Sequence, residues 1–167
     1  MRKKTFIASL LVAIFLCPLY AEAKQQPIYQ YGPGEKLGNT WGGLPLQPYL
    51  DSLPKTSKKA VEDRTVVSMP KGGVRVFRLY RPSAPHYHTK SDAILYVLSG
   101  KGTYEVADGK TIEAEPGTMM YWRAGTPHAL VKLTEGPQDI LIFDVGVRSP
   151  SDIIYLDPKD EGKFSLD

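Results

Sequence analysis

The 167-residue chain is poor in cysteine and histidine, two residue types on which much enzyme chemistry depends. Its one cysteine, Cys17, lies in an N-terminal segment that we expect to be removed, so the mature chain has neither a thiol nucleophile nor a disulfide framework. The sequence contains no Gly-x-Ser-x-Gly motif and no Gly-x-Gly-x-x-Gly phosphate loop. These absences argue against cysteine hydrolases, serine hydrolases of the nucleophile-elbow type and dinucleotide-binding folds.

The N-terminal segment has the layout of a secretory signal. Residues 2–4 are basic, residues 6–19 form an apolar run, and Ala21-Glu-Ala23 places small residues where a signal peptidase reads. The run is shorter than the ~20 residues that span a bilayer, and bulky Leu16 before Cys17 does not fit a lipoprotein signal. We therefore predict cleavage after Ala23, export to the periplasm or the medium, and no membrane insertion of the mature chain.

The mature chain also lacks an excess of one charge. Removal of residues 1–23 leaves 18 basic and 17 acidic side chains out of the 21 and 18 in the full chain. Nucleic-acid-binding proteins usually carry a strong basic footprint, so no nucleic acid partner is expected, and a small molecule is the expected ligand. The remaining 144 residues are enough for one domain with its own core.

Residues 24–63 differ in composition from the rest of the chain. They are dense in Gly, Pro and aromatic residues, which excludes a long helix but also argues against free disorder. We interpret them as an extended arm that lies on the domain or across a dimer partner, with a short helix or a polar loop at 55–64. The C-terminal tail, residues 149–167, contains one more strand-like piece at 152–156.

Residues 64–148 have the pattern of a β domain. Asp108-Gly109 is a strong signal for a tight hairpin with a primed turn. No long amphipathic helix follows the signal segment, and the regular spacing of short strands predicts an antiparallel sandwich or barrel. Runs rich in β-branched and aromatic residues recur at 74–80, 94–98, 103–106, 111–114, 118–122, 129–133 and 140–145.

The three histidines are the candidate ligands of a metal ion. His86 and His88 stand two residues apart in a β context, so both side chains point to one face of a strand. His128 follows the turn Gly125-Thr-Pro127 and begins another strand. Imidazole is the commonest protein ligand for several transition metals. The alternative is that Tyr87 is the core residue and that His86 and His88 face solvent.

The sequence around these histidines resembles the two motifs of the cupin superfamily. Residues 86–100 are similar to Gly-x5-His-x-His-x4-Glu-x6-Gly from its first histidine onward, and residues 117–128 are similar to Gly-x5-Pro-x-Gly-x2-His-x3-Asn. Each histidine of the chain falls on a ligand position of the family. The resemblance implies a small single-domain bacterial cupin, an antiparallel jelly-roll barrel (double-stranded β-helix) with a metal on His86, His88 and His128. It also implies that a homodimer is possible.

One departure from the motifs affects the metal site directly. Ala93 stands where cupins usually place a glutamate ligand, and alanine coordinates nothing. Asp92 is the possible substitute, although strand alternation points it away from the site unless a bulge at 89–92 re-aims it. Tyr80, Arg123 and Lys132 replace other motif residues without removing a ligand.

A three-histidine site resembles those of thiol and β-diketone dioxygenases within the superfamily. The expected cofactor is a divalent transition metal, with Fe, Mn, Ni, Zn and Cu all chemically suitable. We expect an oxygenation, or a metal-assisted isomerisation or decarboxylation, of a small enol, diketone, acid or sugar derivative. The alternatives are a binding module without catalysis and a structural metal. Tyr96, Met119, Tyr121, Trp122 and Arg123 are the candidate pocket residues.

Overall fold

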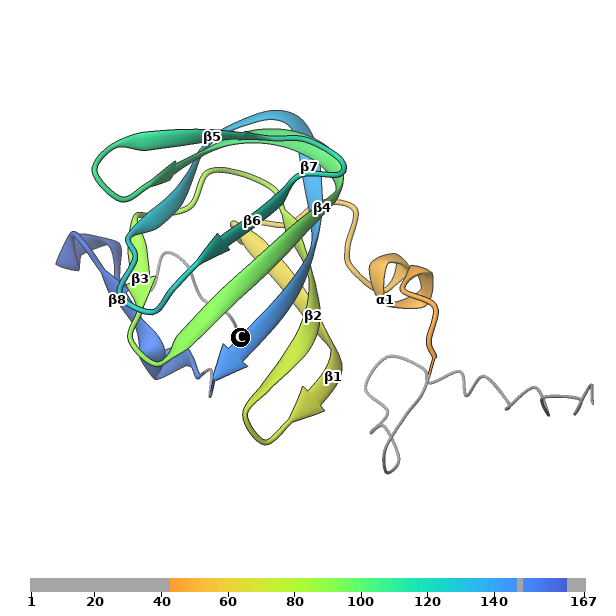
Figure 1. The fold of residues 1–167 in the computed structure, drawn as a ribbon. Helices are drawn as coiled ribbons and strands as arrows, with labels where there is room; N and C mark the ends of the chain where they lie inside the picture. Colours follow the sequence, from red (N-terminus) through yellow and green to blue (C-terminus); the bar gives the residue numbers. More distant parts are fainter. Residues whose placement is uncertain (1–42, 147–148, 162–167) are drawn as a thin grey trace, which may run out of the picture.

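The computed structural model describes residues 43–146 and 149–161, which form eight β-strands and one short helix (Figure 1). The predicted signal segment and residues 24–42 of the predicted arm lie outside these ranges. No helix in the described part is long and apolar enough to cross a membrane. The elements are α1 (Gln47–Asp51), β1 (Val61–Met69), β2 (Gly72–Leu79), β3 (His86–His88), β4 (Ser91–Val106), β5 (Lys110–Ala114), β6 (Met119–Trp122), β7 (His128–Gly146), the 3-10 turn η1 (Pro150–Asp152), β8 (Ile153–Tyr155) and the 3-10 turn η2 (Pro158–Asp160).

The strands pair antiparallel and curl into a jelly-roll barrel, as predicted (Figure 1). Strand β7 is central, because it pairs with β2 on one side and with β4 over nearly the whole length of both strands on the other. Strands β5 and β6 pair with the far side of β4, and β1 pairs with β2. Strand β3 pairs with the start of β7 and with β8, which closes the end of the barrel where the histidines lie.

Two strands are longer than the sequence pattern predicted. Residues 94–98 and 103–106 belong to the single strand β4, and 129–133 and 140–145 belong to β7. The two strands stay paired through several register shifts between Val97 and Tyr104, and Gly100 adopts a φ of 75° there. Bulges of this kind bend a strand without ending it, which explains why a glycine-containing stretch that looked like a turn is part of the sheet.

The predicted hairpin at Asp108-Gly109 is confirmed. It joins β4 to β5, and both residues have positive φ values, 59° for Asp108 and 72° for Gly109. The backbone N–H of Lys110 donates to the carbonyl of Ala107 at 3.4 Å. Two consecutive positive φ values are what a primed hairpin turn requires, and the Asp-Gly pair tolerates them well.

The end of the predicted arm packs on the outside of the barrel. The five-residue helix α1 forms at 47–51, where Pro occupies its first turn, and residues 55–60 are a loop that leads into β1. Tyr49 and Leu53 are buried against Val66 and Val76 on the outer face of β1 and β2. This small second core holds the segment that precedes the barrel.

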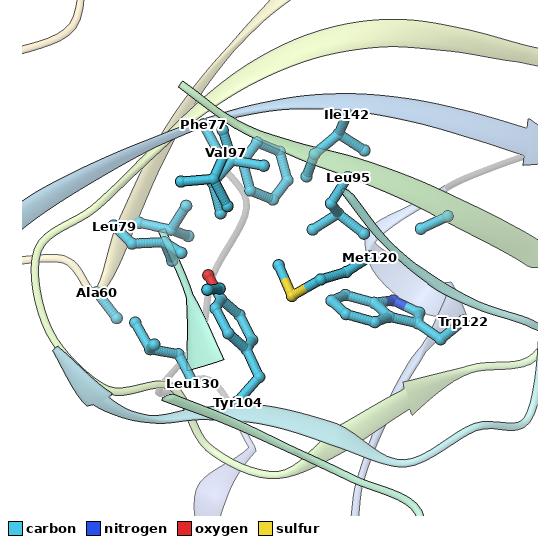
Figure 2. Close-up of a cluster of buried hydrophobic side chains, with 14 residues drawn as sticks. Ala60, Phe77, Leu79, Leu95, Val97, Tyr104, Met120, Trp122, Leu130 and Ile142 are labelled. Atoms are coloured by element: carbon cyan, nitrogen blue, oxygen red, sulfur yellow. The ribbon is translucent and has the colours of Figure 1, made fainter. Parts of the chain in front are cut away.

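The main core fills the barrel interior. Residues that alternate along β2, β4, β6 and β7 point inward and form one cluster of buried side chains. Figure 2 shows Tyr104, Met120 and Trp122 directed into the same interior space as Leu95 and Leu130. One end of this apolar interior borders the three histidines.

Candidate metal centre

Strand pairing brings the three histidines together at one end of the barrel. His86 and His88 alternate with Tyr87 along β3, and both imidazoles are buried, with 3% of each residue exposed. His86 pairs across the sheet with His128, the first residue of β7, which is 7% exposed. The alternative interpretation, with Tyr87 in the core and the histidines in solvent, is wrong, because Tyr87 points the opposite way and is only half-buried.

The geometry of the cluster fits a metal ion. One ring nitrogen of each histidine lies within 4.8 Å of the corresponding nitrogens of the other two. Nδ1 of His86 lies 2.8 Å from the carbonyl oxygen of Ala84, and Nδ1 of His128 lies 2.9 Å from that of Thr126. A carbonyl oxygen only accepts, so in both neutral rings Nδ1 carries the proton and Nε2 keeps its lone pair for a ligand bond.

His88 has a different neighbour on its Nδ1 side. Nδ1 of His88 lies 4.0 Å from Oδ2 of Asp152, a carboxylate from the C-terminal tail that is 1% exposed. Sequence reasoning missed this residue, because Asp152 is more than sixty positions from His88. The one available signal was an acidic residue at the start of the strand-like piece predicted at 152–156.

Trp122 forms part of the wall next to the histidines. Its indole stacks on the imidazole of His128, with ring centroids 4.2 Å apart and 24° between the planes. Residues Met120 and Trp122 of β6 are both buried, so this pair faces the interior. The sequence left open which of the two faces of β6 points inward.

A cavity opens next to the histidines and extends into the apolar core. Its volume is about 40 Å³. Apart from the histidines, its polar side chains are Ser83, Tyr104 and the indole of Trp122. The lining residues are Phe77, Leu79, Ser83, His86, His88, Ala93, Leu95, Tyr104, Trp122, His128, Leu130, Ile140 and Ile142.

Tyr104, in the second half of β4, contributes a hydroxyl group to the cavity lining. Its hydroxyl donates to Oε1 of Gln138 at 2.7 Å, and Nε2 of Gln138 donates to the carbonyl of Ala114 at 3.2 Å. Burial raises the pKa of the Tyr104 hydroxyl far above its ordinary value. The hydroxyl therefore stays protonated at any physiological pH, and its proton is engaged with Gln138.

Three of the predicted pocket residues lie on the outside of the barrel. Tyr96, Met119 and Tyr121 are 37%, 66% and 74% exposed, and none of them lines the cavity. The physical reason is strand alternation: Met120 and Trp122 point inward, so their neighbours on β6 point outward, and Tyr96 alternates with the buried Leu95 and Val97 on β4. The prediction that they line the pocket is wrong.

Arg123 and Asp92 also lie away from the site. The Arg123 side chain is 81% exposed, and its Nε lies 3.8 Å from Oδ2 of Asp92. Asp92 accepts a hydrogen bond from the backbone N–H of Ala124 at 2.8 Å and is not one of the clustered ligand residues. Ala93 points inward and lines the cavity, so its neighbour Asp92 points outward and does not replace the missing glutamate.

Comparison with known families agrees with this arrangement. Residues 66–144 match the family model described as the cupin domain, a range that contains all three histidines. This part of the chain is therefore a cupin domain. The tail residue Asp152 and helix α1 lie outside the matched range. No curated protein matches the chain.

Solved structures share the fold at low sequence identity. A conserved protein with a double-stranded β-helix domain from Klebsiella pneumoniae is 16% identical, with a TM-score of 0.54, over 64% of this chain and 87% of that one. KdgF from Halomonas sp. is 22% identical, with a TM-score of 0.51, over 59% and 92%. A Streptomyces PAC13 variant with uridine is 12% identical, with a TM-score of 0.52, over 64% and 87%. At these identities the likeness concerns the fold alone.

Proposed function

We propose that this protein is an exported single-domain cupin that holds a divalent transition metal on His86, His88 and His128 and acts on a small organic molecule in the adjoining cavity. The observation that carries the proposal is the convergence of three buried imidazole nitrogens within 4.8 Å of one another. Export to the periplasm or the medium rests on the signal-like sequence of residues 1–23.

The charge of the site favours an anionic substrate. Three neutral imidazoles leave both positive charges of a divalent ion uncompensated by a direct ligand, because Ala93 stands at the glutamate position. The surrounding wall is mostly hydrocarbon, and charges attract more strongly where water is excluded. An enolate or an α-hydroxy acid, which offers two oxygens to one ion, fits these requirements.

The size of the cavity favours a small reacting group. The cavity volume of about 40 Å³ corresponds to roughly three water molecules at about 10–15 Å³ each. The reacting end of the substrate therefore enters the cavity beside the histidines, and any larger part stays at the mouth. Leu79, Leu130 and the neighbouring aliphatic side chains would contact its apolar atoms.

The reaction class follows from what the protein groups offer. A bound transition metal would supply Lewis acidity toward a carbonyl or enol oxygen and, in the case of iron, the redox chemistry of oxygenation. Among the lining residues Tyr104 keeps its proton, so no side chain besides the histidines is suited to act as a general base. We therefore favour an oxygenation, isomerisation or decarboxylation of a substrate that arrives already ionised.

The second candidate function is a binding module. The observation that favours it is the same scarcity of acid–base groups among the lining residues, since a site that only holds a ligand needs none. Such a module would retain a small acid or sugar derivative on the metal without converting it.

The two functions differ in what happens to the ligand. We expect the mature protein, residues 24–167 reconstituted with Fe²⁺, to consume oxygen when β-diketones, thiols or flavonols are added in turn. His128→Gln should abolish the uptake, because it removes one of three ligands. Tyr87→Ala is the matched control on β3, since Tyr87 points away from the site, and it should keep the uptake. Recovery of every ligand unchanged, with no oxygen consumed, would favour the binding module.

A further inference from the structure

We propose that Asp152 is the positioning residue of the metal site, a carboxylate that orients His88 and supplies the negative charge absent at Ala93. The inference rests on the proposed metal site and adds to it a part of the chain that the cupin-domain match, residues 66–144, does not contain. It is carried by the placement of the C-terminal segment, by the contacts of the Asp152 carboxylate and by its distance to His88.

The C-terminal segment reaches the site by strand pairing. Strand β8 runs antiparallel to β3, with Ile153 opposite His88 and Tyr155 opposite His86, so that β8 lies beside the histidine strand (Figure 1). The backbone N–H of Leu156 donates to the carbonyl of Pro85 and extends this pairing at 3.0 Å. The residue just before β8 is therefore held next to His88.

The two carboxylate oxygens of Asp152 have different surroundings. Oδ1 accepts from the backbone N–H of Thr89 at 2.9 Å, from the Thr89 hydroxyl at 2.6 Å and from the backbone N–H of Lys90 at 2.8 Å. Oδ2 accepts from the Ser91 hydroxyl at 2.9 Å and faces Nδ1 of His88 at 4.0 Å. One oxygen thus fixes the turn after β3, while the other is directed to the imidazole.

The surroundings of the Asp152 carboxylate stabilise its charged form although the side chain is buried. The hydrogen bonds from Thr89, Ser91 and Lys90 stabilise the charged form of the carboxylate and offset the cost of burying it. A buried side chain with four donors has little freedom to move. Asp152 therefore places a fixed negative charge behind His88.

This arrangement sets His88 apart from the other two ligands. His86 and His128 face neutral backbone carbonyls on their Nδ1 sides, whereas His88 faces a carboxylate. A carboxylate that accepts a hydrogen bond from a ligating imidazole fixes the ring and raises its basicity, and its loss typically weakens metal binding by about 10–100-fold. At 4.0 Å from Nδ1, Asp152 is too far for a direct hydrogen bond and acts on His88 through its charge. Ala93 leaves the site without a ligand carboxylate, so a charge at Asp152 would compensate part of the charge of the ion.

The test is the affinity of the mature chain for Co²⁺, measured by calorimetric titration and by the visible absorption of the bound ion. We expect Asp152→Asn to raise the dissociation constant by about 10–100-fold, because the amide keeps an oxygen for the turn but loses the charge. Asp157→Asn is the matched control, since Asp157 lies in the same tail and only caps η2. It should bind Co²⁺ like the wild type.

The stability of the metal-free protein separates positioning from a merely structural role. Thr89→Val removes one of the four donors to Asp152 but keeps its charge, so it should lower apo stability and weaken Co²⁺ binding less than Asp152→Asn does. If Asp152→Asn behaves like Thr89→Val, the inference is overturned and Asp152 is only a turn cap. If Asp152→Asn does not fold, Asp152→Ser replaces it, because serine keeps an oxygen that can accept a hydrogen bond but carries no charge, and an unchanged Co²⁺ affinity of Asp152→Ser overturns the inference. A wild-type chain that binds no Co²⁺ overturns the proposed metal site as well.

Discussion

At the scale of single residues, backbone carbonyls orient two of the three imidazole rings of the site. Nδ1 of both His86 and His128 is held by a carbonyl only two residues before it in the chain, so each ring is oriented by its own local turn. The indole of Trp122 then limits the space beside His128. Ala93 leaves room on the strand that faces them, which explains why the cavity reaches the histidines.

Tyr104 offers a residue-scale prediction about stability. Tyr104→Phe removes the hydroxyl that donates to Gln138 and leaves the buried amide oxygen of Gln138 without this donor. Because an unsatisfied buried acceptor costs about 1–3 kcal/mol, we expect the free energy of unfolding at pH 7 to fall by that amount. Urea unfolding followed by fluorescence measures it, and Tyr121→Phe on the exposed face of β6 is the control that should be nearly neutral.

The same hydroxyl predicts a dependence on alkaline pH. The pKa of Tyr104 is raised in the folded state, so the folded chain keeps this proton at a pH at which the unfolded chain has lost it. The wild type should therefore lose stability as the pH rises above about 10, the ordinary tyrosine pKa. Phenylalanine has no hydroxyl proton to lose. The difference in the free energy of unfolding between the wild type and Tyr104→Phe should therefore narrow above pH 10. A difference that stays constant would contradict the assigned burial.

The sequence predicted the position of a side chain correctly where only one orientation of its strand was consistent with the pattern. Every histidine was placed on the site, because the motif spacing and β alternation agree. Met119 and Tyr121 were misplaced because both faces of β6 carry large apolar side chains, so the alternation has two solutions. Which face is buried depends on the neighbouring strands and not on β6 itself.

At the scale of elements, the length of β4 and β7 determines the shape of the barrel. Gly100 lies where the two strands shift register, and a Cβ on it would lie 2.7 Å from Cα of Gln138 and from the carbonyl oxygen of Pro137. The hairpin at Asp108-Gly109 could be predicted, because a two-residue signal determines it locally. The continuation of β4 through Gly100 could not, because it depends on a partner strand about 35 residues away in the sequence.

Two glycines with similar backbone angles test this account of the bend. Gly100 has a φ of 75° and Gly109 a φ of 72°, but a Cβ on Gly109 would meet no atom within 4 Å. Gly109→Ala should therefore cost about 1–2 kcal/mol from backbone conformation alone. Gly100→Ala adds contact with fixed backbone and should cost about 2–5 kcal/mol in the same unfolding measurement. Equal losses of unfolding free energy in the two variants would mean that the backbone around Gly100 moves to accommodate a Cβ at little cost.

At the scale of the whole molecule, the site is assembled from three distant parts of the chain. Strand β3 supplies two histidines, the start of β7 supplies the third, and the tail brings Asp152 behind them. The barrel and the histidine cluster were predictable because the spacing of the cupin motifs indicates both the strands and the ligand positions. The contribution of the tail was not, because no local pattern links residue 152 to residue 88.

A bound metal should act on the whole fold, because its ligands come together only in the folded chain. Binding to the folded state adds about 2.7 kcal/mol of stability at a free metal concentration of 100 times the dissociation constant. The ligands and their neighbours on β3, β7 and β8 would then be stabilised together, and a chelator should reverse the effect.

The three-histidine metal site is tested by the metal content of the mature protein, determined by elemental analysis after purification without chelators. We expect one transition-metal ion per wild-type chain and almost none in His128→Gln, with Tyr87→Ala retaining the wild-type content. A His128→Gln protein that is folded and still carries one ion per chain would contradict the assignment of the three imidazoles as ligands.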